Sequence, residues 1–104
     1  MARKKAEARA SGRPRWDGER RELWVGKFLV KGFRRPAPNQ EAILAAFEEL
    51  GWPARIDDPI TGEHGRDPRQ RLHEAIKSLN RNQMHRLIHF EGDGTGEGIR
   101  WTLI

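Results

Sequence analysis

The stretch with the clearest potential for chemistry is FEGDGTGEGIRW, residues 90–101, in which glycines alternate with acidic residues. A dinucleotide site requires G-x-G-x-x-G between a strand and a helix. Counted from Gly92, the sixth position is Glu97. Counted from Gly94, it is Ile99. No Gly-Lys-Ser or Gly-Lys-Thr follows, and the stretch leads into a strand-like run rather than a helix. The spacing therefore predicts no nucleotide site here.

The acids of this stretch, Glu91, Asp93 and Glu97, are hard oxygen ligands of the kind that Ca²⁺ prefers. The calcium loop of helix–loop–helix proteins requires regularly spaced Asp or Asn ligands and a terminal Glu, and that pattern is missing. Glycine supplies the positive φ angles of tight turns, and Asp and Thr side chains hydrogen-bond the local backbone. The sequence predicts that this stretch is the turn of a β-hairpin.

The histidines are the remaining metal-ligand candidates, because the chain has no cysteine. They are His64, His73, His85 and His89. His85 and His89 would be neighbours on a helix, but along a strand they lie about 13 Å apart, which is too far to share an ion. We expect neither a metal nor another cofactor.

Side chains for nucleophilic or acid–base catalysis are few. The serines are Ser11, in the N-terminal tail, and Ser78, within a predicted helix, and neither lies in a recognisable nucleophile elbow. The adjacent carboxylates Asp57 and Asp58 would point apart in an extended segment. The sequence predicts a protein that is not an enzyme.

A basic helix is predicted at residues 67–82. It opens with Asp67-Pro68, an N-cap followed by proline. An apolar stripe at helical spacing faces the core and consists of Leu72, Ala75, Ile76 and Leu79. The opposite side carries side chains that read base edges and phosphates, namely Arg66, Gln70, His73, Lys77 and Arg81. The alternative is an ordinary solvated face, which the nearby Glu74 favours.

The net charge of +5 is concentrated at the N-terminus. Residues 1–21 hold eight basic and three acidic residues, whereas residues 22–104 hold twelve of each. We therefore expect a disordered basic arm at 1–21, with Trp16 packed on a neutral domain at 22–104. A basic arm suits a polyanion such as nucleic acid, but it also serves solubility alone, and the sequence leaves both open. The predicted contacts are Arg3, Lys4, Lys5, Arg9, Arg13 and Arg15.

The remaining segments predict an α+β domain. Residues 22–33 form an N-terminal strand, and a helix follows Asn39 as N-cap and ends at Gly51. A short strand is possible at residues 55–56, and residues 87–103 form a hairpin. With no cysteine, no signal-like N-terminus and no apolar run of about 18 residues, we expect a cytoplasmic protein without membrane contact.

The order strand, acidic helix, basic helix and C-terminal hairpin resembles a winged helix-turn-helix domain, most similar to the C-terminal effector domains of response regulators. Matching helix positions are Leu72, Ile76, Leu79 and Arg81. Matching wing positions are Gly96, Gly98, Trp101 and Leu103. The chain also resembles short bacterial proteins that end in GDGTGxGxRW. The resemblance covers residues 22–104 and implies a recognition helix at 67–82, a wing at 86–104, binding to duplex DNA, transcriptional control and often a homodimer.

The chain departs from the winged-helix pattern in three places. No receiver domain is present, prolines and glycines replace the second helix of a three-helix core, and the tip of the wing is acidic. Winged helices also serve as protein-interaction modules. A protein partner that docks on the acidic helix face formed by Glu41, Glu48 and Glu49 is therefore one alternative. Association of the arm with RNA or the ribosome is another.

Overall fold

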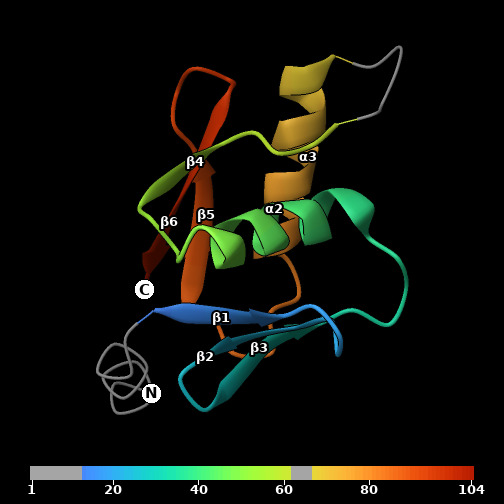
Figure 1. Cartoon of the computed structure of the whole chain (residues 1–104), viewed down its shortest axis with the longest axis vertical. Helices are drawn as coiled ribbons and strands as arrows, with labels where there is room; N and C mark the ends of the chain where they lie inside the picture. The colour runs from blue at the N-terminus through green and yellow to red at the C-terminus, as the bar shows by residue number, and fades with distance from the viewer. Residues whose placement is uncertain (1–12, 62–66) are drawn as a thin grey trace.

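The computed structural model describes residues 13–61 and 67–104, which form two helices and six strands (Figure 1). The elements are β1 (Pro14–Asp17), β2 (Glu22–Val25), β3 (Phe28–Gly32), α2 (Pro38–Glu49), β4 (Arg55–Asp57), α3 (Pro68–Asn80), β5 (Ile88–Gly92) and β6 (Gly98–Leu103). The predicted α+β class is therefore confirmed. Neither helix in these two segments is long and apolar enough to cross a membrane.

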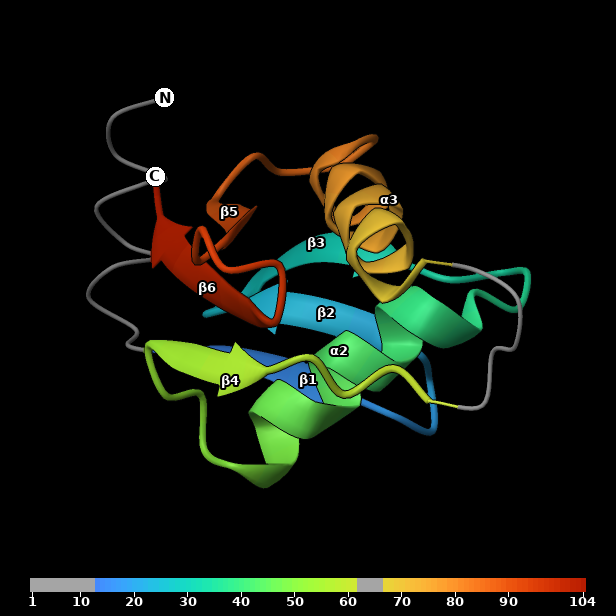
Figure 2. The same cartoon turned by 90° about the horizontal axis from the view of Figure 1, so that it is seen from above.

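The strands form two antiparallel sheets of three strands each. The first has the order β1-β2-β3 and the second the order β4-β6-β5. In Figure 1 the first sheet lies beneath α2, and α3 stands beside the second sheet; Figure 2 gives the view from above. The order of elements differs from the prediction, because the expected single N-terminal strand is a three-stranded sheet. Within the described segments there is no third helix, so the winged-helix details of the prediction remain an expectation.

Strand β1 corrects the prediction that residues 1–21 form a disordered arm. Its burial alternates, with Pro14 and Trp16 toward the core and Arg15 exposed. Trp16 is only 7% exposed and meets the ring of Phe33 edge-on, with 5.5 Å between centroids. The expectation that Trp16 packs on the domain is thus confirmed. The part of the predicted arm at 1–12 lies outside the described residues.

Helix α2 begins two residues earlier than predicted. Ala37 is the N-cap and Pro38 opens the helix, so Asn39 lies inside it. The carboxylate of Glu41 reaches back and accepts a hydrogen bond from the backbone N–H of Ala37, at 2.9 Å. The helix ends as predicted, because Gly51 has a positive φ of 81°, as is common for the glycine that follows the last turn of a helix.

The helical spacing of Ile43, Ala46, Phe47 and Leu50 predicts a buried stripe on α2, and this stripe is confirmed at Ile43 and Phe47. It is wrong at Leu50, which is 64% exposed just beyond the end of the helix. The ring of Phe47 stacks on Trp52 at 5.0 Å and lies 6.1 Å from Phe90. This aromatic group joins α2 to the second sheet.

Helix α3 follows the sequence pattern closely. The side chain of Asp67 caps it by accepting from the N–H of Arg69 at 3.0 Å, and Pro68 opens it. The four predicted apolar positions are buried against β5 and α2. The helix ends at Asn80, slightly before the predicted end.

The C-terminal hairpin is also confirmed, with Phe90 opposite Trp101 in register. The possible strand at residues 55–56 exists as β4, which pairs with the outer edge of β6 through Ile56 and Ile99. Both of these isoleucines are buried, as is Phe90. The hairpin is therefore part of the core and gives α3 a rigid neighbour.

Candidate nucleic-acid interface

The outward face of α3 carries three of the five predicted contact residues, namely Gln70, His73 and Lys77, and a fourth, Arg81, is the C-cap residue just beyond the helix. All four are exposed, and the spacing of three or four residues makes the first three neighbours along the helix surface. The fifth, Arg66, lies outside the described residues. The side-chain amide of Gln70 donates to Glu74 at 3.0 Å, so Glu74 also belongs to this face. The result is a mixed polar face with two exposed cations at its C-terminal half.

Contacts from outside the helix fix the position of α3. The side-chain amide of Asn80 donates to the carbonyl of Phe90 at 2.8 Å and accepts from its N–H at 2.9 Å. At the helix end, the ammonium of Lys31 donates to the carbonyls of Ser78 and Arg81. A cation is favourable there because the free carbonyls give a helix C-terminus a partial negative charge. These bonds join α3 to both sheets.

Lys31 and Arg81 also bring two positive charges together. Burial lowers the pKa of Lys31, and the neighbouring charge of Arg81 lowers it further. The cationic surface of α3 therefore continues toward β3. Sequence reasoning missed this contact, because Lys31 belongs to a predicted strand that is far from the helix along the chain.

The two arm residues that the structure describes, Arg13 and Arg15, do not join the α3 face. Arg13 donates to the carbonyl of Gly51 at 3.3 Å, at the end of α2. The guanidinium of Arg15 lies 5.6 Å from the centre of the Trp24 ring. The other four predicted contacts, Arg3, Lys4, Lys5 and Arg9, lie outside the described residues. Arg13 and Arg15 thus belong to the surface of the first sheet, not to a free arm.

The acidic turn between β5 and β6 is held by its own acids. One oxygen of Asp93 accepts from the N–H and the hydroxyl of Thr95, at 2.9 and 2.7 Å. The other lies 2.6 Å from Nε of Arg55. Glu91 pairs with Arg100 at 3.3 Å. Two of the three acids are therefore neutralised by arginines of neighbouring strands, and the prediction of a hairpin turn is confirmed.

The glycines of this turn have two different functions. Gly94 and Gly96 have φ of 95° and 80°, which L-residues rarely adopt. Gly98 has a packing reason instead, because a Cβ there would collide with the carboxylate of Asp93 and the guanidinium of Arg55. In the described segments no group of three His, Asp or Glu side chains is placed to hold a metal ion.

We expect Asp93→Asn to reduce the dependence of stability on acidic pH. Hydrogen bonds from Thr95, followed by the pairing with Arg55, hold the pKa of Asp93 well below its usual range. As pH falls below about 4, the unfolded chain takes up this proton first. The wild type is therefore more stable than the variant at neutral pH, and this advantage shrinks from about pH 4 to pH 2. Urea titrations across this range measure it.

Asp57→Asn is the matched control, because Asp57 also pairs with Arg55 but its side chain is 88% exposed. It is expected to cost less stability at neutral pH than Asp93→Asn. Equal pH dependence in the wild type and in Asp93→Asn would contradict the structural role of Asp93.

Two arginines near the start of α3 are placed differently. Arg71 is buried, and its Nη2 donates to the carbonyl of Ile60 at 3.2 Å, so it is not part of the outward face. Arg69 is exposed, and its side chain crosses the hairpin turn: a Cβ on Gly96 would lie 2.8 Å from it. Both are basic residues of the predicted helix at 67–82, and only the structure shows that one is buried and the other exposed.

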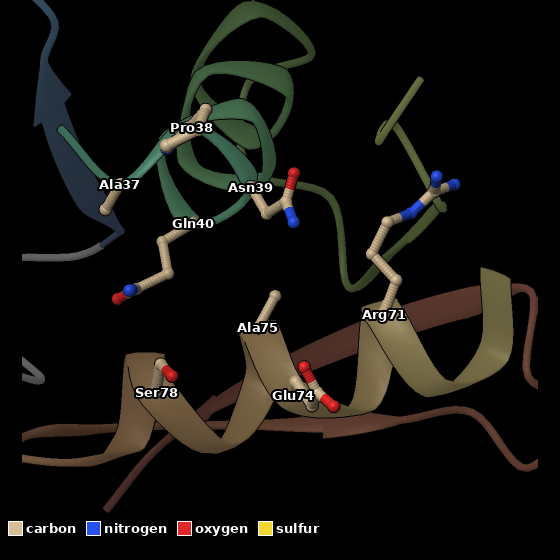
Figure 3. Close-up of a pocket in the computed structure, with 8 residues that line it drawn as sticks. All are labelled: Ala37, Pro38, Asn39, Gln40, Arg71, Glu74, Ala75 and Ser78. Atoms are coloured by element: carbon tan, nitrogen blue, oxygen red, sulfur yellow. The ribbon is translucent and has the colours of Figure 1, made fainter. Parts of the chain in front are cut away.

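A hollow of about 210 Å³ lies between the start of α2 and the side of α3 (Figure 3). Gln40 and Ser78 line one end, and Arg71 points away from it toward the chain after β4. Its lining contains Glu74 but no histidine, so a serine–histidine arrangement is absent there. We find no chemical assignment for this hollow.

The basic excess lies mainly on the first sheet. Residues 13–35 hold eight basic and three acidic residues, a net charge of +5. Residues 36–61 hold one basic and five acidic residues, and residues 67–104 hold six and five. When net charge is counted separately for residues 1–21 and 22–104, this basic segment is not apparent. The reason is that the lysines and arginines of β3 and the following loop are then summed with the acids of α2. The structure thus adds a second basic surface to that of α3.

The acidic face of α2 is less available than the sequence suggests. Glu41 forms an ion pair with Arg21 at 2.8 Å. One oxygen of Glu48 accepts from the backbone N–H of Trp16 and from the indole of Trp52, at 2.8 and 2.9 Å. Two of the three glutamates therefore hold the fold together. Only Glu49 remains of the surface predicted to dock a protein partner.

Comparison of the chain with protein-family models, with curated proteins and with solved structures gives no match.

Proposed function

We propose that the protein is a non-enzymatic nucleic-acid-binding protein that presents the outward face of α3 to duplex DNA, as a small transcriptional regulator or nucleoid-associated factor. The observation that carries the proposal is the exposure of Gln70, His73 and Lys77 along a helix whose other side is fixed in the core, with the exposed Arg81 at its C-cap. Amide, imidazole and cationic side chains are those that contact base edges and phosphates.

Two further features support this proposal. Two of the three acids of the hairpin turn are paired with Arg55 and Arg100, so the turn beside α3 repels phosphate less than its sequence suggests. Lys31 adds a positive charge next to Arg81 at the C-terminal end of the helix. The surface that faces a duplex is then positive from Lys77 to β3.

The rivals make different demands on the chain. A protein-interaction module that uses the α2 face would depend on Glu49, since Glu41 and Glu48 are engaged within the fold. RNA or ribosome binding through the N-terminal arm would depend on residues 3–9 and be indifferent to α3. Competition between duplex DNA and structured RNA for the same protein separates the second rival from the proposal.

Lys77→Ala combined with Arg81→Ala is expected to weaken duplex binding by one to two orders of magnitude at low salt, because each cation neutralises a phosphate. The slope of log affinity against log salt concentration should fall by about 1.8, since each phosphate contact contributes about 0.9. Fluorescence anisotropy of a labelled duplex over a salt series measures both quantities.

Arg100→Ala is a suitable charge control, because Arg100 is exposed but lies on β6 and pairs with Glu91. It is expected to leave duplex affinity nearly unchanged. If duplex affinity is unchanged by the Lys77→Ala, Arg81→Ala double substitution but is lost when the basic residues at 3–9 are replaced by neutral ones, then α3 does not contact the duplex.

A further inference from the structure

We infer that the outer face of the β1-β2-β3 sheet is a second nucleic-acid site, which binds a single-stranded segment by stacking a base on Trp24. Arg15 of this surface was among the contacts predicted from sequence, but Trp24 and the cations of β3 and its flanking loops were not. Single-strand sites combine an aromatic side chain, on which a base stacks, with cations that follow the phosphates. Both components are present on this sheet.

The register of the sheet places Trp24 at the centre of its outer face. Arg15 on β1 and Leu29 on β3 are its direct cross-strand partners. Burial alternates along β1 and β2, so that Trp16, Leu23 and Val25 face the core while Arg15 and Trp24 face outward. The guanidinium of Arg15 lies over the indole ring, 5.6 Å from its centre, so this face of the ring is turned toward a cation and not into the core. A sheet with a tryptophan on its open face offers the platform that an unpaired base requires.

A basic groove adjoins this platform. It has a volume of about 470 Å³, and its lining includes the cations Arg20, Lys31 and Arg34. Leu29, the partner of Trp24, also lines it, so groove and platform are continuous. Met84, which is 67% exposed, adds an apolar side chain at the far wall. A chain of alternating bases and phosphates fits such a mixed surface.

Two of the three acids of residues 13–35 are engaged within the protein. Asp17 accepts hydrogen bonds from the backbone N–H groups of Glu19 and Arg20, both at 3.0 Å. Glu22, which also lines the groove, accepts from the indole N–H of Trp24 at 3.3 Å. Residues 13–35 hold a net charge of +5, of which the pairing of Arg21 with Glu41 offsets one, and the remaining positive charge favours binding of a polyanion. A folded three-stranded face suits a flexible single strand rather than a rigid duplex.

Trp24→Leu is the test, since leucine keeps apolar bulk but removes the aromatic face. Anisotropy with a labelled thymidine 12-mer and a uridine 12-mer is expected to show about tenfold weaker binding by this variant. Trp24→Phe should retain most of the affinity. Arg20→Ala with Arg34→Ala should lower the salt slope by about 1.4, since each single-strand phosphate contact contributes about 0.7. Both arginines are exposed, so this double variant tests the surface even where substitution of Trp24 affects folding.

The two proposals fail independently. The Lys77→Ala, Arg81→Ala double variant is expected to bind the 12-mers as the wild type does, while losing duplex affinity. If the protein binds the 12-mers through Trp24 but does not bind duplex DNA, only the α3 proposal is overturned. The single-strand proposal is overturned if the protein does not bind the 12-mers. It is also overturned if neither Trp24→Leu nor the Arg20→Ala, Arg34→Ala double substitution changes that binding. A preference between the two 12-mers identifies RNA or DNA as the source of the strand.

Discussion

Trp16→Ala is expected to destabilise the domain by about 3–5 kcal/mol, the usual cost of removing a large buried aromatic side chain. Trp16 is 7% exposed and packs edge-on against Phe33. Its backbone N–H is also held by Glu48 of α2, so β1 is fixed to the helix by packing and by a hydrogen bond. Because small domains are stable by only about 5–15 kcal/mol, the loss is a large part of the total. Urea denaturation followed by circular dichroism measures the free energy of unfolding.

The matched control is Trp24→Ala, the same substitution on the adjacent strand but on the opposite face of the sheet. Trp24 is only partly buried, so its loss should cost distinctly less stability than that of Trp16. Trp16→Phe should recover much of the lost free energy. If Trp16→Ala unfolds at the same urea concentration as the wild type, then β1 is not an integral strand, and residues 14–17 belong to an arm after all.

Sequence alone did not reveal β1, and the reason lies in its pairing. A strand of four residues offers only two inward positions, Pro14 and Trp16, which is too few for a recognisable period. The arginines around these two positions make the segment rich in charge, which is typical of a disordered terminus. What makes it a strand is its partner, since Trp16 lies opposite Leu23 of β2 in register. Pairing between strands is tertiary information that composition does not contain.

Local signals were more reliable. Asp67 and Pro68 marked the start of α3 correctly, because capping depends on residues within one turn. Gly51 marked the end of α2 for the same reason, by its positive φ. Asn39 did not mark the start of α2 correctly. Pro38, the residue before it, is already the first residue of the helix, a position at which proline is tolerated.

The candidate site likewise combines features that local sequence predicts with features that depend on residues distant in the chain. The outward positions of α3 follow from helical periodicity, and the structure leaves Gln70 and Lys77 exposed as the spacing predicts, whereas Arg81 lies just beyond the helix as its C-cap. The acidic turn was puzzling in sequence because its partner is distant: Arg55 lies 38 residues before Asp93. The surface around Trp24 was missed because the sequence did not reveal which face of the strand is covered.

Asn80→Ala is expected to cost about 2–4 kcal/mol, because it leaves two backbone groups of a buried residue without partners. The side-chain amide of Asn80 donates to the carbonyl of Phe90 and accepts from its N–H, as a further strand would at the edge of β5. Phe90 is fully buried, so water cannot easily replace these bonds, and each orphaned group costs about 1–3 kcal/mol. The loss also frees the C-terminal end of α3 from the second sheet. The free energy of unfolding from urea titration, together with amide hydrogen exchange at Phe90, reports both effects.

The size of this effect bears on function, because Asn80 neighbours Arg81 and fixes the end of the helix that carries Lys77. Gln70→Ala is the control on the same helix: Gln70 is exposed and bonds only to Glu74, so its loss should change stability by less than about 0.5 kcal/mol. Asn80→Asp keeps the acceptor for the N–H of Phe90 but loses the donor to its carbonyl, and is expected to be destabilised as well. If Asn80→Ala is as stable as Gln70→Ala, and the N–H of Phe90 remains protected from exchange, then this amide is not what holds α3 against β5. The orientation of the α3 face would then depend on apolar packing alone.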